Sequence, residues 1–370
     1  GWIAAMLARG ADRGWRPHIL HGHDWHAGLA PAYLAALRDQ SEPSVPSVFT
    51  IHNLAYPGLF PAAAFADLAL PPAFFAIDGV EFFGQVSFLK AGLYYADRLT
   101  TVSPTYAGEI RTPAFGCGFD GLLRSRAGVL SGILNGVDPQ IWDPRNDGAL
   151  PQPYGIENAE TGKRRAKTAL QRRLGLVEQA ETPLFGAVSR LAPQKGLDLV
   201  LAALPALLAG GAQLALLGSG DAALEAGYAE AARTHNGRVG VAFGYDEALA
   251  HLIIAGSDVV LVPSRFEPCG LTQLYALRYG SLPLVRRVGG LADTVVDADA
   301  VALAEDRATG FVFDADTAEA LAAAIGRALA LWRQPALWRQ IMRRAMSQDF
   351  SWAAAARRYL ALYREVAPHA

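Results

Sequence analysis

The chain has 370 residues, more than one ordinary domain holds and enough for two. Hydrophobic residues make up 52% and charged residues 18%, and the net charge of −2 argues against nucleic acid as the main ligand, because nucleic-acid binders concentrate basic charge. Cys117 and Cys269 lie far apart and form no C-x-x-C pair, which argues against a disulfide framework or a zinc site and favours a reducing, cytoplasmic compartment.

The start of the sequence already has a helical pattern. Residues 1–7 read as part of a helix and there is no initiator methionine, so we expect a fragment whose N-terminal portion is absent. No signal peptide is visible. Residues 199–218 carry no charge, but Pro205 and the pair Gly210-Gly211 interrupt them. A buried helix, a turn and a strand are therefore expected there instead of a membrane span.

Short apolar runs alternate with amphipathic runs of helix length in the first part of the chain. We expect strands at 18–21, 47–52, 98–102 and 132–134, and helices at 27–38, 88–96 and 104–110. Residues 139 to about 182 are rich in proline and then strongly charged, particularly at 163–167. This composition predicts a hinge followed by a surface helix with a solvated charged face.

The second part repeats the alternation more clearly. We expect strands at 184–188, 213–217, 239–243, 259–262 and 282–285, and helices at 197–209, 222–234, 248–255 and 271–279. Ser351 is a plausible N-cap for a final helix over 352–365.

Strand, helix and strand units in series predict parallel sheets covered on both faces. The predicted fold class is α/β, with two doubly wound, Rossmann-like domains facing a central cleft and the first domain incomplete. We expect a first domain at 1–138, a second at 139–347, and a C-terminal helix within 348–370 that packs back on the first domain. Because ligands bind beyond the carboxyl ends of such strands, functional residues are sought just after them.

Arg190 and Lys195 follow the predicted strand at 184–188. A guanidinium fork and an ammonium point charge suit a diphosphate group. The alternative is a loop with solvated cations, which an isolated pair of this kind would favour.

The segment 263–272 follows the most hydrophobic strand of the second part and opens a helix. The free N–H groups of Gly270, Leu271 and Thr272 are expected to point outward with the positive end of the helix dipole. Glu267 precedes them, and a carboxylate beside an anion site is understandable if it binds the neutral hydroxyls of a sugar. The alternative, a simple helix-start charge, is weaker because Pro268 and Cys269 separate Glu267 from the helix.

Two further patterns of the second part are less specific. Gly218 begins a G-x-G turn after a strand, which indicates either a nucleotide contact or a tight turn with Asp221 as N-cap. Two D-x-D patterns, at 297–299 and 314–316, resemble metal sites of glycosyltransferases but fall in turn-like surface segments. We expect no metal, because two cations and a helix N-terminus can neutralise a diphosphate.

The first part places a polar cluster at 21–26, after its first strand. A zinc site is one interpretation, although histidines this close on one strand rarely share tetrahedral geometry. The other is a polar cluster at the cleft, with Asp24 and the face of Trp25 offered to a carbohydrate. His52 and Asn53 end the next predicted strand and are expected nearby.

Together these motifs resemble bacterial and plastid glycogen and starch synthases, which are retaining GT-B glucosyltransferases that use ADP-glucose. The resemblance covers nearly the whole chain, and it is carried by residues 190–196, 265–271, 23–26, 85–106 and 135–138.

The resemblance implies elongation of an α-1,4-glucan at its non-reducing end, without a cofactor. Arg190 and Lys195 would hold the leaving diphosphate, and Glu267 with the backbone of Cys269 and Gly270 would hold the glucosyl hydroxyls. Asp24 and His52 would line the reacting centre. Further residues are implied on the nucleotide side (Tyr245, Leu271, Thr272, Gly218 and Asn135) and on the acceptor side (Trp25, His26 and Asn53).

Two departures from the family pattern stand out. The N-terminal Lys-Thr-Gly-Gly loop of the family is not in this sequence, whereas the similar segment 289–293 falls in the second domain. Many retaining GT-B enzymes carry a second glutamate eight residues after the first, where this chain has Tyr275. A UDP-sugar-dependent transferase and a glucan-binding protein without catalysis remain alternatives.

Overall fold

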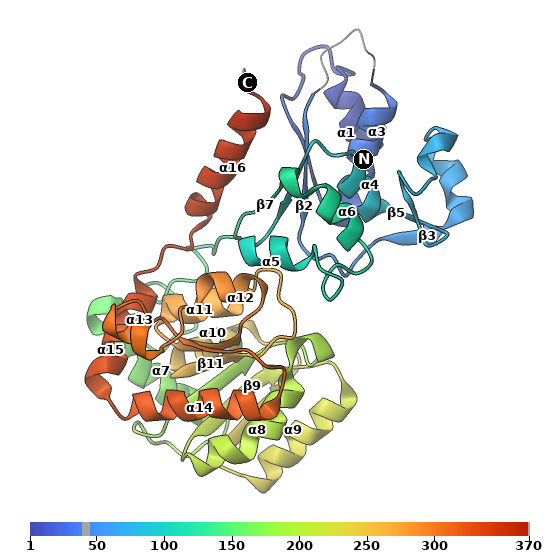
Figure 1. Cartoon of the computed structure of the whole chain (residues 1–370). Helices are drawn as coiled ribbons and strands as arrows, with labels where there is room; N and C mark the ends of the chain where they lie inside the picture. The colour runs from blue at the N-terminus through green and yellow to red at the C-terminus, as the bar shows by residue number, and fades with distance from the viewer. Residues whose placement is uncertain (39–44, 369–370) are drawn as a thin grey trace. The chain divides into compact units, whose positions relative to one another are not determined.

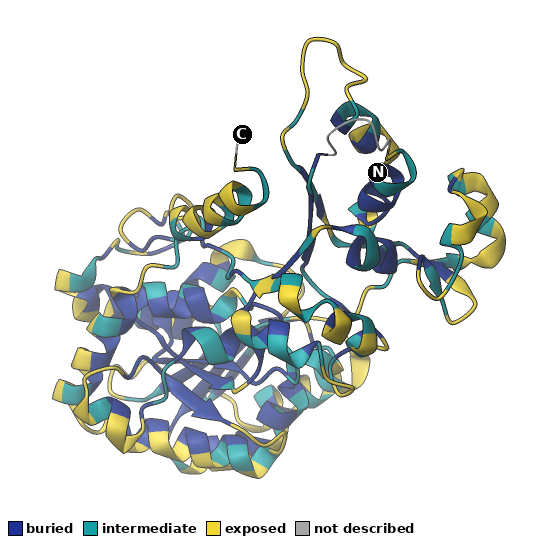
Figure 2. Ribbon diagram, turned by 45° about the horizontal axis from the view of Figure 1, so that its top comes forward, coloured by how far each residue is buried: buried dark blue, intermediate teal, exposed yellow. Residues whose placement is uncertain are grey.

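The computed structural model describes residues 1–38 and 45–368, and the chain divides into two compact units (Figure 1). Unit 1 comprises Gly1–Asn135 and Ala353–Ala370, and unit 2 comprises Gly136–Trp352. Neither unit contains, within the described residues, a helix long and apolar enough to cross a membrane. In unit 2 most of the strand residues are dark blue in Figure 2, because the sheet forms the centre of the hydrophobic cores.

Unit 1 is built on a parallel sheet in the order β1-β2-β6-β7. Its strands are β1 (Leu20–His23), β2 (Ser47–Ile51), β6 (Arg98–Thr101) and β7 (Leu130–Gly132). Its α-helices are α1 (Trp2–Ala8), α2 (Asp24–Ala27), α3 (Leu29–Ala36), α4 (Phe88–Tyr95), α5 (Pro104–Glu109), α6 (Asp120–Ser125) and most of α16 (Trp352–Val366). The sequence placed the first strand two residues too early, because pairing begins where Leu20 meets Ser47.

A small antiparallel sheet in unit 1 was not predicted. It has the order β3-β5-β4, with β3 (Leu59–Pro61), β4 (Glu81–Phe82) and β5 (Gln85–Ser87). Strands of two or three residues are too short to show an alternating pattern. The predicted strand at 132–134 was also misplaced, since pairing with β6 ends at Gly132.

Unit 2 contains a six-stranded parallel sheet in the order β10-β9-β8-β11-β12-β13. Its strands are β8 (Leu184–Val188), β9 (Gln213–Gly218), β10 (Val239–Phe243), β11 (Val259–Val262), β12 (Leu282–Arg286) and β13 (Phe311–Phe313). Its helices are α7 (Ala159–Arg173), α8 (Leu197–Ala209), α9 (Ala222–Thr234), α10 (Glu247–Gly256), α11 (Thr272–Tyr279), α12 (Gly289–Thr294), α13 (Ala300–Ala304), α14 (Ala318–Trp332) and α15 (Pro335–Met346).

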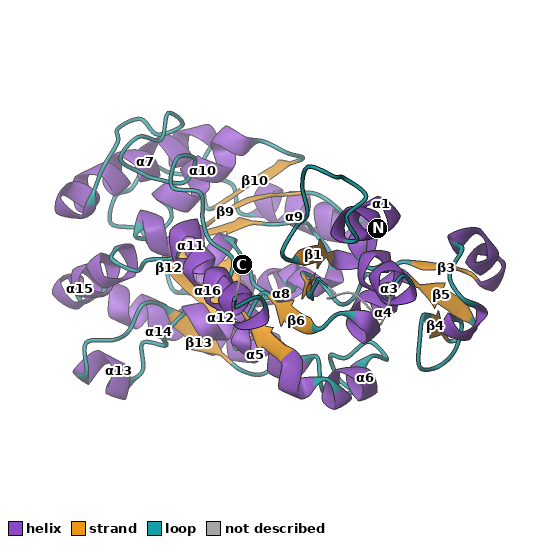
Figure 3. Ribbon diagram, turned by 90° about the horizontal axis from the view of Figure 1, so that it is seen from above, coloured by secondary structure: helices purple, strands orange, loops and turns teal. Residues whose placement is uncertain are grey.

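Helices cover both faces of the unit 2 sheet (Figure 3). One hydrophobic cluster contains residues of α8 and α14, and another contains residues of α7 and α10. Both faces are therefore buried in all strands except the edge strand β10, whose second half is partly exposed, and the buried strands read as continuous apolar runs in the sequence. Several helix starts are fixed by caps, as where the carboxylate of Asp221 accepts from the N–H groups of Ala223 and Leu224.

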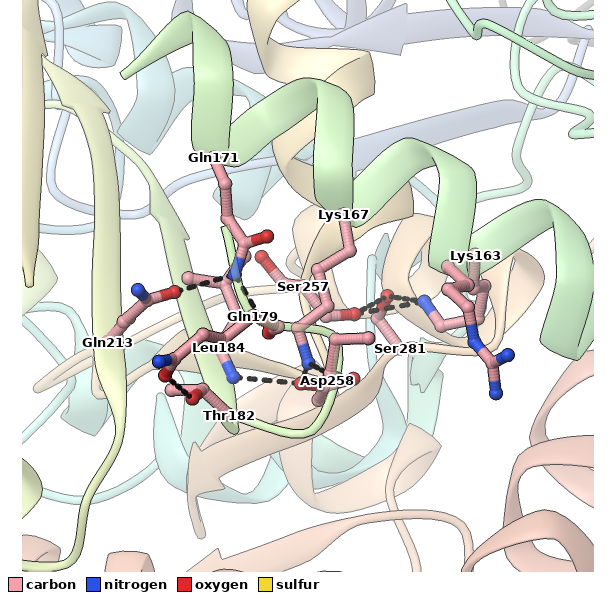
Figure 4. A network of polar contacts seen from close by, with 12 residues as sticks. Lys163, Lys167, Gln171, Gln179, Thr182, Leu184, Gln213, Ser257, Asp258 and Ser281 are labelled. Carbon is pink, nitrogen blue, oxygen red and sulfur yellow. Dashed lines mark hydrogen bonds and ion pairs between the residues drawn. The ribbon is translucent and has the colours of Figure 1, made fainter. Parts of the chain in front are cut away.

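The prediction of a solvated charged face on α7 was wrong for Lys163 and Lys167, which are buried. Figure 4 shows both side chains directed to the ends of strands. The Nζ of Lys163 donates to the carbonyls of Ala255 and Ser257 and to Ser281, whereas Lys167 pairs with Asp258 at 2.7 Å. These contacts fasten α7 to the amino-terminal edge of the sheet, opposite the edge where the predicted site residues lie.

Candidate active site

Lys195 and Glu267 meet at the carboxyl-terminal edge of the unit 2 sheet. Lys195 ends a short 3-10 turn after β8, and Glu267 lies in the loop after the neighbouring strand β11. The Nζ of Lys195 lies 2.6 Å from Oε2 of Glu267, and the hydroxyl of Ser264 donates to the same oxygen at 2.9 Å. Glu267 is only 7% exposed, and a carboxylate buried to this extent needs a counter-charge. The ammonium group of Lys195 supplies it.

Arg190 follows β8 at the same edge and is exposed. Among the described residues no ion pair of its guanidinium is found. Arg265, in the loop after β11, differs because it binds Asp198 with two nitrogens and also pairs with Asp316. These carboxylates raise the pKa of Arg265, Asp198 contributing most. Arg190 is thus available to an incoming anion, while Arg265 fastens loops to one another.

The segment 265–272, called here the donor loop, runs from β11 into α11 against the backbone of Gly289 and Gly290. A Cβ on Gly289 would lie 2.0 Å from the carbonyl oxygen of Glu267, and one on Gly290 would lie 2.0 Å from that of Cys269. Side chains at these two positions would therefore force the loops apart. Gly270 has a φ of 72°, a left-handed conformation that suits glycine.

Of the remaining nucleotide-side predictions, Gly218, Thr272 and Tyr245 lie on this edge and Asn135 lies in unit 1. Gly218 ends β9, Thr272 begins α11, and Tyr245 follows β10 with 89% of its surface exposed. Asp221 is an N-cap, as one interpretation of the G-x-G turn anticipated.

In unit 1, Asp24 holds the loop that follows β2. Its Oδ1 accepts from the N–H of His52 at 2.7 Å and from that of Asn53 at 3.4 Å. Asp24 adopts a positive φ of 53°, which is costly for a residue with a side chain and is typical of functional sites. The next two side chains, Trp25 and His26, are stacked with ring centroids 3.9 Å apart. The structure therefore brings the five residues predicted to line the reacting centre or contact the acceptor (Asp24, Trp25, His26, His52 and Asn53) to one edge of the unit 1 sheet.

Histidines form a row beside Asp24. Nδ1 of His23 lies 2.9 Å from Nε2 of His52, and the His23 ring stacks on His21 at 4.3 Å. His21 is held by Thr50 on β2 and by Tyr363 on α16, at 2.7 and 2.6 Å. Burial, together with repulsion from His23 and His52, lowers the pKa of His21 to about 4, so the ring is neutral at physiological pH.

No group of three or more histidine, cysteine, aspartate or glutamate side chains placed to hold a metal ion is found within residues 1–38 and 45–368. The acids of the D-x-D patterns are engaged elsewhere. Asp297 pairs with Arg327, Asp314 with Arg287 and Asp316 with Arg265, while Asp299 caps α13.

Ser264, Gln273 and Thr294 were missed by the sequence reasoning. Ser264 lies within the motif 263–272, so its adjacency to Glu267 was a usable signal. Gln273 and Thr294 are polar residues in helices, and nothing in the sequence distinguishes them from solvated ones. They are nevertheless buried beside the donor loop, where they bond to each other.

Known protein families match both parts of the chain. Residues 1–125 match the family described as starch synthase catalytic domain, and residues 173–345 match glycosyl transferases group 1. A glycogen synthase of Serratia proteamaculans is 58% identical over 368 residues, covering 99% of this chain and 76% of that protein. A glycogen synthase of Albidiferax ferrireducens is 56% identical over 370 residues, covering 100% of this chain and 75% of that protein.

A solved structure agrees over the same extent. The catalytic domain of starch synthase IV from Arabidopsis thaliana, bound to ADP and acarbose, superimposes with a TM-score of 0.89 at 33% identity and covers 99% of this chain and 76% of that one. A sucrose-phosphate synthase from Thermosynechococcus elongatus, at 22% identity and a TM-score of 0.60, shares the fold. With this identity and coverage, the chain belongs to the glycogen and starch synthase family of glycosyltransferases, which have the GT-B fold.

Proposed function

We propose that this chain transfers glucose from ADP-glucose to the non-reducing 4-hydroxyl of an α-1,4-glucan, with retention of configuration. The observation that carries the proposal is the Lys195–Glu267 pair at the carboxyl edge of the unit 2 sheet. Arg190 follows β8 at the same edge, and no ion pair of its guanidinium is found among the described residues. This arrangement offers positive charge to a diphosphate and a carboxylate to a sugar. The ADP and acarbose bound to the Arabidopsis relative support these two ligand classes.

Each polar atom of this pair has a distinct role in the proposal. Oε2 of Glu267 is occupied by Lys195 and Ser264, and no bond to Oε1 is found among the described residues. Oε1 is therefore the oxygen left to accept from a glucosyl hydroxyl. Lys195, held in place by Glu267, and Arg190 stabilise the negative charge that develops on the leaving ADP. Cys269, Gly270, Leu271 and Thr272 supply backbone contacts, and Tyr245 and Gly218 lie on the nucleotide side.

The proposed reaction breaks the bond between C1 of glucose and the diphosphate oxygen and forms a bond from C1 to O4 of the acceptor. The acceptor attacks the face from which ADP departs, and its proton passes to the departing phosphate oxygen. Asp24 acts by holding the backbone at His52, and Trp25, His26 and Asn53 contact the acceptor. No metal is required, since cations and amide dipoles supply the counter-charge. Cys117 and Cys269 form no disulfide in the described part of the chain, which favours a cytoplasmic location.

ADP release with glycogen as acceptor tests the proposal. We expect Arg190→Ala and Lys195→Ala each to lower kcat by about 10² to 10³, as removal of a preorganised donor does. Arg165→Ala, which removes an exposed cation from α7, is the matched control and should leave kcat unchanged. Unchanged turnover in both Arg190→Ala and Lys195→Ala would contradict the assignment of these two residues to the diphosphate.

Three further assays separate the finer claims. Competition between ADP-glucose and UDP-glucose for turnover decides the nucleotide. Activity that persists with excess EDTA supports a metal-free mechanism, and activity restored only by added metal opposes it. A glucosyl group trapped covalently on a side chain would contradict same-face attack.

A further inference from the structure

Gln273, on the first turn of α11, is completely buried directly behind the donor loop. Its Nε2 donates to the carbonyl of Cys269 at 3.1 Å and to that of Gly270 at 3.0 Å. It also lies 3.2 Å from Oγ1 of Thr294, whose hydroxyl donates to the carbonyl of Gly290 at 2.6 Å. One amide and one hydroxyl therefore link the donor loop to the glycine pair that packs against it.

The direction of these bonds fixes the orientation of two peptide groups. In a planar trans peptide the C=O of one residue and the N–H of the next point in opposite directions. Because the carbonyls of Cys269 and Gly270 are turned inward to Gln273, the N–H groups of Gly270 and Leu271 are turned the other way. No partner of either N–H is found among the described residues. Successive free N–H groups of this kind form an anion-binding concavity.

The amide of Gln273 has one stable orientation at this place. Exchanging its two terminal atoms would set Oε1 against the carbonyl oxygens of Cys269 and Gly270, which are acceptors only. As placed, Oε1 is buried without a partner in the described chain. A buried unpaired oxygen is costly, so a residue chosen only for stability would not be expected here.

We infer that Gln273 and Thr294 are positioning residues that hold the Gly270 and Leu271 N–H groups in the orientation needed for the diphosphate of the donor. This inference rests on the proposed function and adds to it two residues that do not themselves contact the substrate. We call these two residues, Gln273 and Thr294, the clamp. The clamp affects the binding of the diphosphate and the stabilisation of the leaving group, and it affects neither the adenine of the nucleotide nor the acceptor.

Gln273→Met tests the clamp, because methionine keeps the volume and removes the amide. We expect kcat for ADP release to fall by about tenfold to a hundredfold, less than for removal of a donor itself. ADP binding should weaken by a similar factor, whereas adenosine, which lacks phosphate, should compete as it does with the wild type. A purely structural role would not separate ADP from adenosine.

Gln171→Met is the matched control, since Gln171 is another buried glutamine whose Nε2 donates to Gln179 and Gln213 and whose Oε1 has no partner within residues 1–38 and 45–368. It lies at the opposite edge of the sheet, near the amino end of β9 (Figure 4). We expect Gln171→Met to lower the melting temperature and to leave kcat and ADP affinity within twofold of the wild type. If both variants change the kinetics equally, the clamp is refuted and only a contribution to stability remains.

Thr294→Val and Thr294→Ser provide a second test if Gln273→Met does not fold. The valine variant should lose ADP affinity and kcat in the same direction as Gln273→Met, and the serine variant, which keeps the hydroxyl, should retain both. Equal behaviour of valine and serine would overturn the role of Thr294. A wild-type chain that neither binds nor releases ADP would instead overturn the proposed function, and the inference with it.

Discussion

His21 illustrates how an environment sets the charge of a single residue. Its ring lies between Thr50 and Tyr363 and stacks on His23, and this surrounding lowers its pKa from 6.5 to about 4. Between these two values the unfolded chain binds a proton that the folded chain does not. The contribution of the neutral His21 ring to the free energy of unfolding is therefore fully present above pH 6.5 and is lost as the pH falls towards 4.

We expect this histidine to account for about 1–2 kcal/mol of the acid-induced loss of unfolding free energy, after allowing for screening by water. Urea unfolding at pH 7 and pH 4.5 measures it. His21→Asn should have a smaller difference between the two pH values than the wild type, while His235→Asn, at an exposed position, should match the wild type. An unchanged pH difference in His21→Asn would contradict the assignment.

At the scale of elements, a glycine within a helix can raise or lower the stability of the fold, depending on which atoms lie opposite its Cα. In α4, a Cβ on Gly92 would lie 2.5 Å from the ring of Phe49, which is buried in β2. In α14, nothing lies within 4 Å of a Cβ on Gly326, which is exposed. The first glycine permits close packing of a helix on the sheet, and the second only weakens its helix.

The two corresponding alanine variants should therefore change the free energy of unfolding in opposite directions. Gly326→Ala should raise the free energy of unfolding by about 0.5–1 kcal/mol through helix propensity. Gly92→Ala should lower it by about 1–3 kcal/mol, because overpacking outweighs that gain. Chemical denaturation of the two variants and the wild type decides the matter, and stabilisation by both would show that Phe49 can move aside.

The elements that sequence analysis placed well are those whose physical signal is strong. The strands β8, β10 and β11 stand out as apolar runs between turn residues, and they agree with the structure residue for residue. The short strands β3 to β5 give no periodic signal. Lys163 and Lys167 were assigned to solvent because charge usually lies there, and only the fold shows the carbonyls and the carboxylate that hold them.

In the candidate site, too, some features have a signal in the sequence and others depend on the folded arrangement. Arg190, Lys195 and Glu267 were found because each follows a strand in a motif. That Lys195 and Glu267 bind each other could not be known, because the register between β8 and β11 is a property of the assembled sheet. Gln273 carried no signal at all, since its function depends on which carbonyls surround it.

At the scale of the whole molecule, ADP should act on one unit. All of the proposed diphosphate contacts come from Gly136–Trp352, so ligand binding should stabilise this unit by mass action, by about 2.7 kcal/mol at a hundredfold excess over Kd. Hydrogen exchange measured with and without ADP should show protection in β8, β11 and the peptide containing Gly270. Protection of equal size throughout Gly1–Asn135 would contradict a site confined to unit 2.

The two chain connections of unit 2 lie next to each other. Val137, near its beginning, forms a parallel bridge with Ser351, near its end, and the N–H of Val137 donates to the carbonyl of Phe350 at 2.7 Å. Topologically, unit 2 is thus a domain inserted into unit 1, and the chain leaves it almost where it entered. Such a domain can be excised with its ends already joined by a hydrogen bond, and it can be permuted at a surface loop without a long linker. It follows that the two connections are mechanically coupled, because a displacement of Val137 strains its hydrogen bond to Phe350 and with it the segment that leads to α16.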